Sequence, residues 1–326
     1  MSQASKPRLL IVRAIFPEVL ARLEQFFDVE SNQGDVVLSP SELARRLQGR
    51  QAALTTTADR IDPTLLAACP DLKICANMAV GTNNFDLPAM AASGVAATNT
   101  PDVLTETTAD FGFALMMATA RRISEGEAYL RAGQWTKWGH DLLAGSDVHG
   151  ATLGILGMGR IGQGIAKRGA LGFGMKVIYH NRSRLSAGLE AECQASYVSK
   201  DELLQTADHL VLVLPYSAAS HHTIGAAELA QMKPTATLVN IARGGIVDDA
   251  ALAAALKARV IAAAGLDVFE GEPAVHPALL DLPNVVLTPH IASASLSTRR
   301  AMANLAADNL IAFFAGQPLL TPVHAA

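Results

Sequence analysis

Three ionisable side chains in the second half of the sequence could together hold an anionic substrate and protonate it. Arg243 follows an apolar run, Glu272 lies in the Glu-Gly-Glu-Pro segment at 270–273, and His290 lies in Thr-Pro-His at 288–290. A histidine donates protons well near neutral pH, and a neighbouring carboxylate stabilises its charged form. An arginine can bind a substrate carboxylate or polarise a carbonyl. This set of residue types suits the protonation step of a hydride-transfer reaction.

Each of the three also has a structural explanation. An isolated histidine is more often structural than catalytic, Arg243 could cap a strand end, and Glu272 could be a solvated turn residue. The spacing alone does not join them, so for any one residue taken alone the structural explanation is favoured. Other parts of the chain must show that a reactive cofactor binds nearby.

A glycine fingerprint predicts a dinucleotide site. Gly157, Gly159 and Gly162 follow an apolar run at 152–156, which is typical of a buried parallel strand, and precede a predicted helix over 160–171. A strand, a glycine turn and a helix N-terminus together present free N–H groups and a positive dipole end to a pyrophosphate. The alternative is a tight strand-to-helix turn without a ligand, and the matching context on both sides favours the dinucleotide.

The end of the next strand indicates which dinucleotide binds. After the run 175–179, Asn181 stands where an NAD site would carry the acidic residue that binds the ribose 2′-hydroxyl. Arg182 and Arg184 could hold a 2′-phosphate with their guanidinium groups, and Ser183 adds a hydroxyl. The alternative is a solvated basic loop. We expect NADPH to be preferred, with NADH possible.

Composition limits the remaining function classes. Half of the 326 residues are hydrophobic, aromatics make up 5%, and the net charge is −4, which argues against a nucleic-acid binder. No apolar stretch of about 20 residues could span a membrane, and the first seven residues lack the apolar core of a signal peptide. Cys69, Cys75 and Cys193 are scattered, as expected of reduced thiols in the cytoplasm, and we expect no metal site.

The order of predicted elements indicates an α/β fold with two Rossmann-like domains, each a doubly wound parallel sheet. The cofactor domain, 103–290, is expected to be inserted into a discontinuous substrate domain, 1–102 with 291–326, and ligands usually bind in the cleft between two such domains. The expected strands are 9–12, 52–55, 72–76, 95–97, 153–156, 176–179, 210–214, 237–240, 263–266 and 285–288. Besides 160–171, helices are expected near 17–26, 63–68, 104–120 and 297–314.

Over essentially its full length the chain resembles the D-2-hydroxyacid dehydrogenase family, and within it the bacterial glyoxylate/hydroxypyruvate reductases, also described as 2-ketogluconate reductases. The resemblance is carried by motifs in the same order, namely Val-Gly-Thr-Asn-Asn at 80–84, Asn-Thr-Pro at 99–101, Leu-Thr-Glu-Thr-Thr-Ala-Asp at 104–110, the glycine fingerprint, Asn-Ile-Ala-Arg-Gly at 240–244, the segment 264–273 and Pro-His-Ile at 289–291. So many motifs in one order are highly specific.

The resemblance implies roles for individual residues of the substrate site. Arg243 would bind the substrate, and His290, paired with Glu272, would donate the proton. The backbone N–H groups of Val80 and Gly81 would receive the substrate carboxylate. Also implied near the substrate is Ser293.

The resemblance also implies cofactor contacts beyond the fingerprint and the loop at 181–184. Asp267 would hold the nicotinamide carboxamide, Thr108 would lie near the nicotinamide, and Arg160 and Ile161 would touch the pyrophosphate. The implied cofactor-binding residues also include Pro215, Ile241, Ala242 and His290. Two departures stand out: Ala292 replaces a common glycine, and an aliphatic pair, Leu142 and Leu143, stands near the place of a tryptophan in some relatives. The second departure leaves the preferred substrate size open.

The implied activity is NADPH-dependent reduction of small 2-keto acids (glyoxylate, hydroxypyruvate and, as a further candidate, 2-ketogluconate) to D-2-hydroxy acids. The enzyme would be a cytoplasmic homodimer. Its contact surface could be the helix at 104–120 and the segment of Trp135 and Trp138; alternatively that helix is internal.

Two rival readings remain. A formate dehydrogenase of the same fold would carry Gln in place of Glu272, and phosphite oxidation is a remoter option. A dinucleotide-sensing regulator would typically add a disordered tail and need not turn over a substrate. Turnover of any 2-keto acid discriminates these classes.

Overall fold

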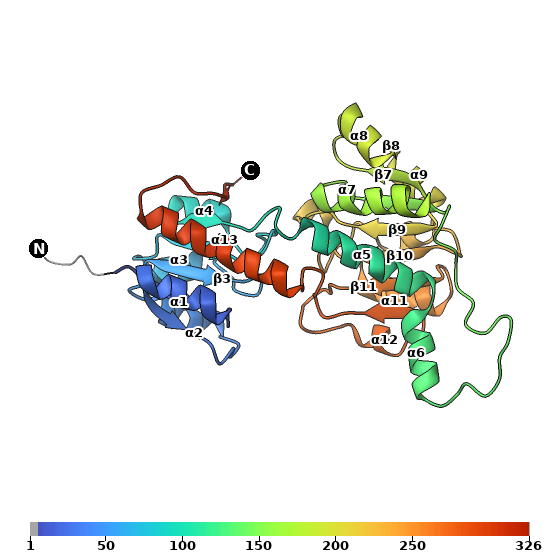
Figure 1. Cartoon of the computed structure of the whole chain (residues 1–326), viewed down its shortest axis with the longest axis horizontal. Coiled ribbons are helices and arrows are strands. Elements are labelled where there is room, and N and C mark those ends of the chain that lie inside the picture. Colours follow the sequence, from blue (N-terminus) through green and yellow to red (C-terminus); the bar gives the residue numbers. More distant parts are fainter. Residues whose placement is uncertain (1–5, 326) are drawn as a thin grey trace, which may run out of the picture. The chain divides into compact units, whose positions relative to one another are not determined.

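The computed structural model describes residues 6–325, which form two compact units (Figure 1). The first unit is Met1–Leu104 with Ala294–Ala326, and the second is Thr105–Ser293. The sequence-based expectation that the first seven residues are no signal peptide concerns mainly residues 1–5, which lie outside the described residues. Within the described chain, no helix is both long and apolar enough to cross a membrane. The assignment of 1–102 with 291–326 to a substrate domain and of 103–290 to a cofactor domain stays a prediction.

The first unit is a six-stranded sheet in the order β13-β5-β4-β3-β1-β2. Its strands are parallel except for β13, which pairs antiparallel with β5. Without β13, the order 2-1-3-4-5 is the flavodoxin-type variant of the doubly wound arrangement. The elements are β1 (Arg8–Ile11), α1 (Pro17–Phe26), β2 (Asp28–Ser31), α2 (Pro40–Leu47), β3 (Ala52–Thr55), α3 (Pro63–Ala68), β4 (Ile74–Asn77), α4 (Leu87–Ala92), β5 (Ala96–Thr98), α13 (Leu296–Phe314) and β13 (Pro322–Val323).

Helix α13 completes the first unit from the far end of the chain. In Figure 1 it runs beside α1 across one face of the sheet. Ala303, Ala306 and Leu310 of α13 are fully or almost fully buried in one cluster with Leu9 and Leu54 of the sheet. Small side chains let the helix approach the sheet closely, so this face of the N-terminal sheet depends on residues about 250 to 300 positions later.

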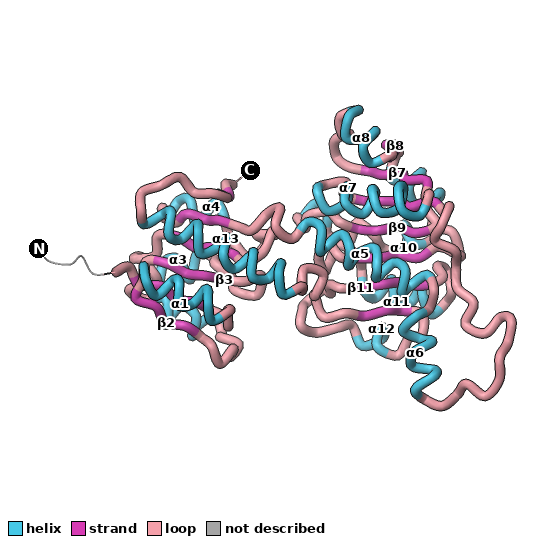
Figure 2. The backbone as a smooth tube through the Cα atoms, in the orientation of Figure 1, coloured by secondary structure: helices cyan, strands magenta, loops and turns pink. Residues whose placement is uncertain are grey.

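The second unit is a seven-stranded, wholly parallel sheet with helices on both faces (Figure 2). The first half holds α5 (Thr105–Ala120), α6 (Ile123–Arg131), β6 (Thr152–Leu156), α7 (Arg160–Lys167), β7 (Lys176–His180), α8 (Ala187–Cys193), β8 (Ala195–Tyr197) and α9 (Lys200–Thr206). The second half holds β9 (His209–Leu212), a 3₁₀ turn (Ala218–Ser220), α10 (Ala226–Leu229), β10 (Thr237–Asn240), α11 (Asp249–Lys257), β11 (Ala263–Leu266), α12 (Pro277–Leu280) and β12 (Val285–Leu287).

The strand order of this sheet fixes where a ligand can bind. It runs β12-β11-β10-β9-β6-β7-β8, so the direction of winding reverses between β6 and β9. In open α/β sheets, ligands bind outside the carboxyl ends of the strands at such a switch point. The glycine turn follows β6, the strand beside that point. The expected fold class, two doubly wound α/β units, is confirmed.

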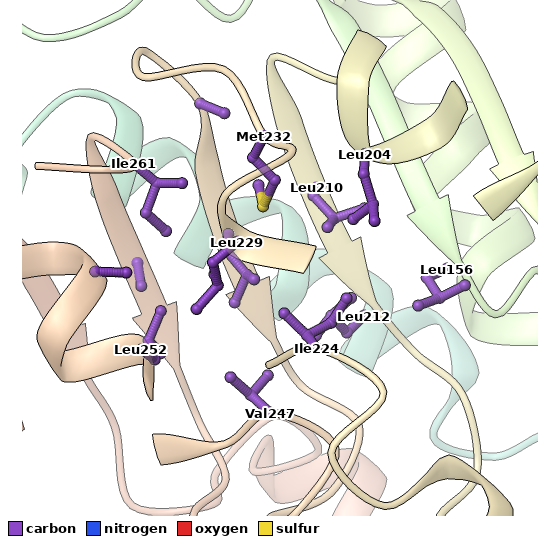
Figure 3. Close-up of a cluster of buried hydrophobic side chains, with 14 of the residues drawn as sticks. Leu156, Leu204, Leu210, Leu212, Ile224, Leu229, Met232, Val247, Leu252 and Ile261 are labelled. Carbon is purple, nitrogen blue, oxygen red and sulfur yellow. The ribbon is translucent and has the colours of Figure 1, made fainter. Parts of the chain in front are cut away.

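Apolar clusters cover both faces of the second sheet. On one face, side chains from β9, α9, α10 and α11 point toward one another, among them Leu212, Leu204, Leu229 and Leu252 (Figure 3). On the other face, α5 and α7 pack on the sheet through residues such as Met116. Helix α5 thus buries one side on its own sheet, while Glu106, Asp110 and Ala114 on its other side are exposed. Its role as a contact surface stays a prediction.

Several element limits differ from the sequence prediction. The helix expected over 160–171 is α-helical only to Lys167 and then forms a π turn over Arg168–Gly172. Within this turn Gly169 comes so close to the sheet that a Cβ would lie 2.6 Å from Leu153. Strands β2 and β8 at sheet edges and β13 were not predicted, because they are short and only partly buried.

Candidate active site

The three fingerprint glycines meet three different physical needs. Gly157 has φ +102°, and a Cβ there would lie 2.6 Å from the backbone nitrogen of Leu214. A Cβ on Gly162 would lie 2.5 Å from the carbonyl oxygen of Gly157, so this glycine lets α7 pack against the turn. Gly159, the N-cap of α7, has nothing within 4 Å of a Cβ. Its open backbone leaves room for a pyrophosphate at the helix N-terminus, as a dinucleotide site requires.

A buried hydroxyl on α5 also fits a bound cofactor. Among the described residues, the Oγ1 atom of Thr108 is buried and has no hydrogen-bond partner. The next residue, Ala109, faces α7, where a Cβ on Gly164 would lie 2.9 Å from its Cβ. An unpaired buried hydroxyl is costly, so a hydrogen bond from outside the chain would stabilise this site. The expected contact of Thr108 with the nicotinamide side stays a prediction.

The loop after β7 is ordered by its own side chains. Asn181 accepts a hydrogen bond of 2.6 Å at Oδ1 from the N–H of Met158 in the glycine turn. It thus connects the two loops that would enclose the adenosine half of a dinucleotide, and it adds no negative charge. Arg182 and Ser183 are exposed.

Arg184 has a different environment from Arg182. Its Nε and Nη2 atoms each donate a hydrogen bond of 2.8 Å to the Glu190 carboxylate, which also accepts one from the Tyr179 hydroxyl. These hydrogen bonds lower the pKa of Glu190. Arg184 therefore orders the loop, while the exposed Arg182 is the better placed of the two to meet a phosphate.

The structure brings Glu272 and His290 together. Nδ1 of His290 lies 2.7 Å from Oε2 of Glu272, although 18 residues separate them in the sequence. Both side chains are about one-third exposed, so a substrate can reach the ring. With Nδ1 held by the carboxylate, Nε2 is the nitrogen left to exchange a proton. His290 has φ +53°, and its backbone N–H donates to the carbonyl of Asp267.

Charges around Glu272 keep it ionised. Burial alone would raise its pKa, but the hydrogen bond and charge of His290, the Phe269 N–H and the charge of Arg243 lower it instead. Burial lowers the pKa of Arg243, opposed by Glu272, and its Nη1 donates a 2.7 Å hydrogen bond to the Ala242 carbonyl. An arginine stays protonated under such conditions. The second unit thus presents a cation, an anion and a histidine in one neighbourhood.

Asp267 shapes the loop that carries His290. It is fully buried, and its carboxylate accepts hydrogen bonds of 2.8 Å from the N–H groups of Ile291 and Ala292 and from the Thr288 hydroxyl. Burial raises the pKa of Asp267, and these hydrogen bonds oppose the rise. The observed role is to anchor the backbone on both sides of His290. A hydrogen bond to the nicotinamide carboxamide stays a prediction.

The other expected residues fall in two places. Val80 and Gly81 belong to the first unit, where their carbonyls accept hydrogen bonds from Asn99 and Asn77. Within the second unit, the structure gives the following for the remaining residues: Arg160 and Pro215 are exposed, Ile161 and Ser293 are half-buried, and Ile241 and Ala242 are buried. All their ligand contacts stay predictions.

Sequence reasoning missed a residue that shapes the Arg243 loop. Asn240, fully inside the unit, accepts at Oδ1 from the N–H of Ala242 and donates through Nδ2 to the carbonyl of Arg243. Its place directly at the carboxyl end of β10 was the available signal.

Comparison with known proteins identifies the family of this chain. The family model described as "D-isomer specific 2-hydroxyacid dehydrogenase, NAD binding domain" matches residues 113–292. A glyoxylate reductase of Thermococcus onnurineus is 46% identical over 316 residues, covering 96% of this chain and 94% of that protein.

Solved structures show the same similarity. The NADPH-dependent glyoxylate/hydroxypyruvate reductase of Sinorhizobium meliloti, in complex with NADP and malonate, has a TM-score of 0.87 and 37% identity, covering 98% of this chain and 97% of that one. The D-mandelate dehydrogenase of Rhodotorula graminis also has a TM-score of 0.87, with 28% identity over 99% of both chains.

Proposed function

Because the chain belongs to the D-isomer specific 2-hydroxyacid dehydrogenase family, we propose that it reduces glyoxylate and hydroxypyruvate to the corresponding 2-hydroxy acids. It is an NAD(P)-dependent oxidoreductase acting on small keto acids. 2-Ketogluconate is a further candidate substrate, and NADPH is the proposed reductant. The observation that carries the proposal is the 2.7 Å contact between His290 and Glu272, supported by the charge of Arg243, which helps to lower the pKa of Glu272.

The residues divide the chemistry between them. A bound reduced nicotinamide supplies a hydride to the keto carbon. Arg243 attracts the substrate carboxylate and the keto oxygen, which gains negative charge during reduction. Nε2 of His290 gives its proton to that oxygen, completing the hydroxyl group. Glu272 stabilises the charged imidazole before the transfer, and Asp267 keeps the His290 backbone in place.

NADPH preference is supported by the loop after β7. Asn181 carries no charge that would repel a 2′-phosphate, and the exposed Arg182 supplies a cation. The Sinorhizobium meliloti enzyme, described as NADPH-dependent, binds NADP. The D-mandelate dehydrogenase shows that this fold also serves larger substrates, so the ranking of keto acids must be measured.

The test is steady-state oxidation of NADPH and NADH, followed at the nicotinamide absorbance, with glyoxylate, hydroxypyruvate and 2-ketogluconate in parallel. We expect turnover with the first two acids and higher kcat/KM with NADPH. His290→Asn should lower kcat on the order of 10²–10⁴-fold while NADPH still binds. A His290→Asn enzyme with near-normal turnover would refute the assignment of the proton donor.

We further propose that the protein is a cytoplasmic homodimer. Trp135 and Trp138 are 57% and 70% exposed, and Ile123 and Leu130 of α6 are also exposed. Large exposed apolar side chains gathered in one segment are typical of an interface. Light scattering during size-exclusion chromatography should give twice the mass of one chain. A Trp138→Ser variant that remains fully dimeric would place the interface elsewhere.

A further inference from the structure

A second cluster of ionisable side chains lies outside the proposed catalytic pair. His221, His222 and Glu270 are exposed and offer three ligand atoms that all lie within 4.8 Å of one another. Nε2 of His222 lies 2.9 Å from Oε2 of Glu270, and Nε2 of His221 lies 4.0 Å from Oε1. We propose that these three side chains bind a divalent transition-metal ion of the Zn²⁺ class. The sequence-based expectation of no metal site rested on the cysteines alone.

The donor set suits such an ion. Two imidazoles and one carboxylate form an established ligand set for Zn²⁺, which leaves a further position for water. Ligand atoms at about 2.0–2.2 Å from a tetrahedral ion lie roughly 3.3–3.6 Å apart. The observed 2.9 and 4.0 Å lie on either side of that spacing, although they end at different oxygens of Glu270. All three ligand atoms lie within 4.8 Å of one another, so binding an ion requires them to move by about an ångström. Mg²⁺ and Ca²⁺ are disfavoured because they prefer all-oxygen ligands.

The backbone is arranged to place both rings on the same side. His222 has φ +50°, and its N–H donates a 2.7 Å hydrogen bond to the carbonyl of Gly245. The rings of His221 and His222 are stacked, with centroids 3.8 Å apart. Gly245 itself has φ +77°, and a Cβ there would lie 3.2 Å from Nδ1 of His221.

An oxygen atom lies near the second nitrogen of each ring, at hydrogen-bond distance for His221 and farther away for His222. Nδ1 of His221 lies 3.1 Å from the Tyr216 hydroxyl, and Nδ1 of His222 lies 3.9 Å from a carboxylate oxygen of Asp248. Metal-binding histidines typically use the second nitrogen in this way, with an oxygen partner that fixes the tautomer and turns the other nitrogen toward the ion. The cluster therefore has both the ligands and the supporting contacts of a metal site.

The site would connect two loops of the second unit. His221 and His222 follow the 3₁₀ turn after β9, and Glu270 precedes Gly271 and Glu272. A bound ion would hold the turn that also carries the partner of His290. The proposal does not depend on the reductase activity, because binding is measured without nucleotide or substrate.

The experiment titrates untagged, chelator-treated full-length protein with Co²⁺ and with Zn²⁺. We expect one equivalent to bind, seen by calorimetry for Zn²⁺ and by visible absorption of protein-bound Co²⁺. Bound metal should also raise the melting temperature. Glu270→Gln and His222→Ala should each weaken binding at least tenfold.

Two further sets of variants make the test specific. Asp248→Asn keeps an N-cap oxygen for α11 but removes the charge behind His222, and should weaken binding about 10–100-fold. The matched controls Glu202→Gln and His149→Asn change exposed residues elsewhere and should leave binding unchanged. Absence of stoichiometric binding to the wild-type protein would overturn the proposal, as would equal weakening in the controls or full binding by Glu270→Gln.

Discussion

Replacing Arg182 with alanine should weaken NADPH binding and spare NADH. Arg182 is exposed at the end of β7, next to Asn181, whose hydrogen bond to Met158 fixes the loop against the glycine turn. A hydrogen bond to a charged group contributes about 1.5–3 kcal/mol, and 1.4 kcal/mol corresponds to a factor of ten in affinity. Because solvent screens an exposed guanidinium, we expect the lower end, about a tenfold increase in the NADPH dissociation constant.

The assay is fluorescence titration of the wild-type and variant proteins with each dinucleotide, at low and high ionic strength. The NADH dissociation constant should change less than about twofold, since NADH lacks the 2′-phosphate. Added salt should weaken NADPH binding to the wild-type protein more than to Arg182→Ala. The matched control is Arg121→Ala, another exposed arginine of the second unit with no role in the proposed site. Equal losses for both dinucleotides would refute the phosphate assignment.

Three other predictions follow from the structure. Glu272→Gln should lower kcat at least tenfold but less than His290→Asn, because the proton donor remains; steady-state kinetics check this order. Gly157→Ala should lower the free energy of unfolding, measured in urea, by about 1–3 kcal/mol. The control Gly174→Ala should lower it less, because Gly174 also has a positive φ but has open space where the Cβ would lie. Burial lowers the pKa of His209 in the folded protein, so on acidification the unfolded state takes up a proton at higher pH than the folded state does. The free energy of unfolding should therefore fall as the pH drops below about 6.5. His209→Gln should reduce this pH dependence, as measured by urea titrations.

The central strands of both sheets were predictable because burial on both faces requires apolar side chains at successive positions. Strands covered on both faces are continuous apolar runs, and β3, β10 and β11 lie where those runs were seen. The edge strand β2 contains Asp28 and Glu30 and is partly exposed, so its sequence carries no such run. Strand β13 forms through pairing with β5 more than 200 residues away, which no local pattern records.

The sequence predicted which residues belong to the candidate site, but not how they are arranged in space. The residue types of Glu272 and His290 suggested their chemistry, yet only the fold brings Nδ1 and Oε2 to 2.7 Å. The two arginines of the 181–184 loop had equal standing in the sequence. The structure distinguishes them, because Glu190 in the following helix, α8, forms an ion pair with Arg184. Likewise, the proposed metal site needs a third ligand besides His221 and His222. The fold supplies it from Glu270, 48 residues after His222.

The late position of α13 bears on the order of events during synthesis. The second unit is one continuous segment, Thr105–Ser293, so every residue of its sheet is synthesised before α13. The first unit lacks the helix that covers Leu9 and Leu54 until that moment. Nascent chains usually fold from the N-terminal domain onward. Here the middle of the chain can fold first, while one apolar face of the N-terminal sheet has only α1 to cover it until α13 is made. This partly covered face is the part that most needs protection from aggregation.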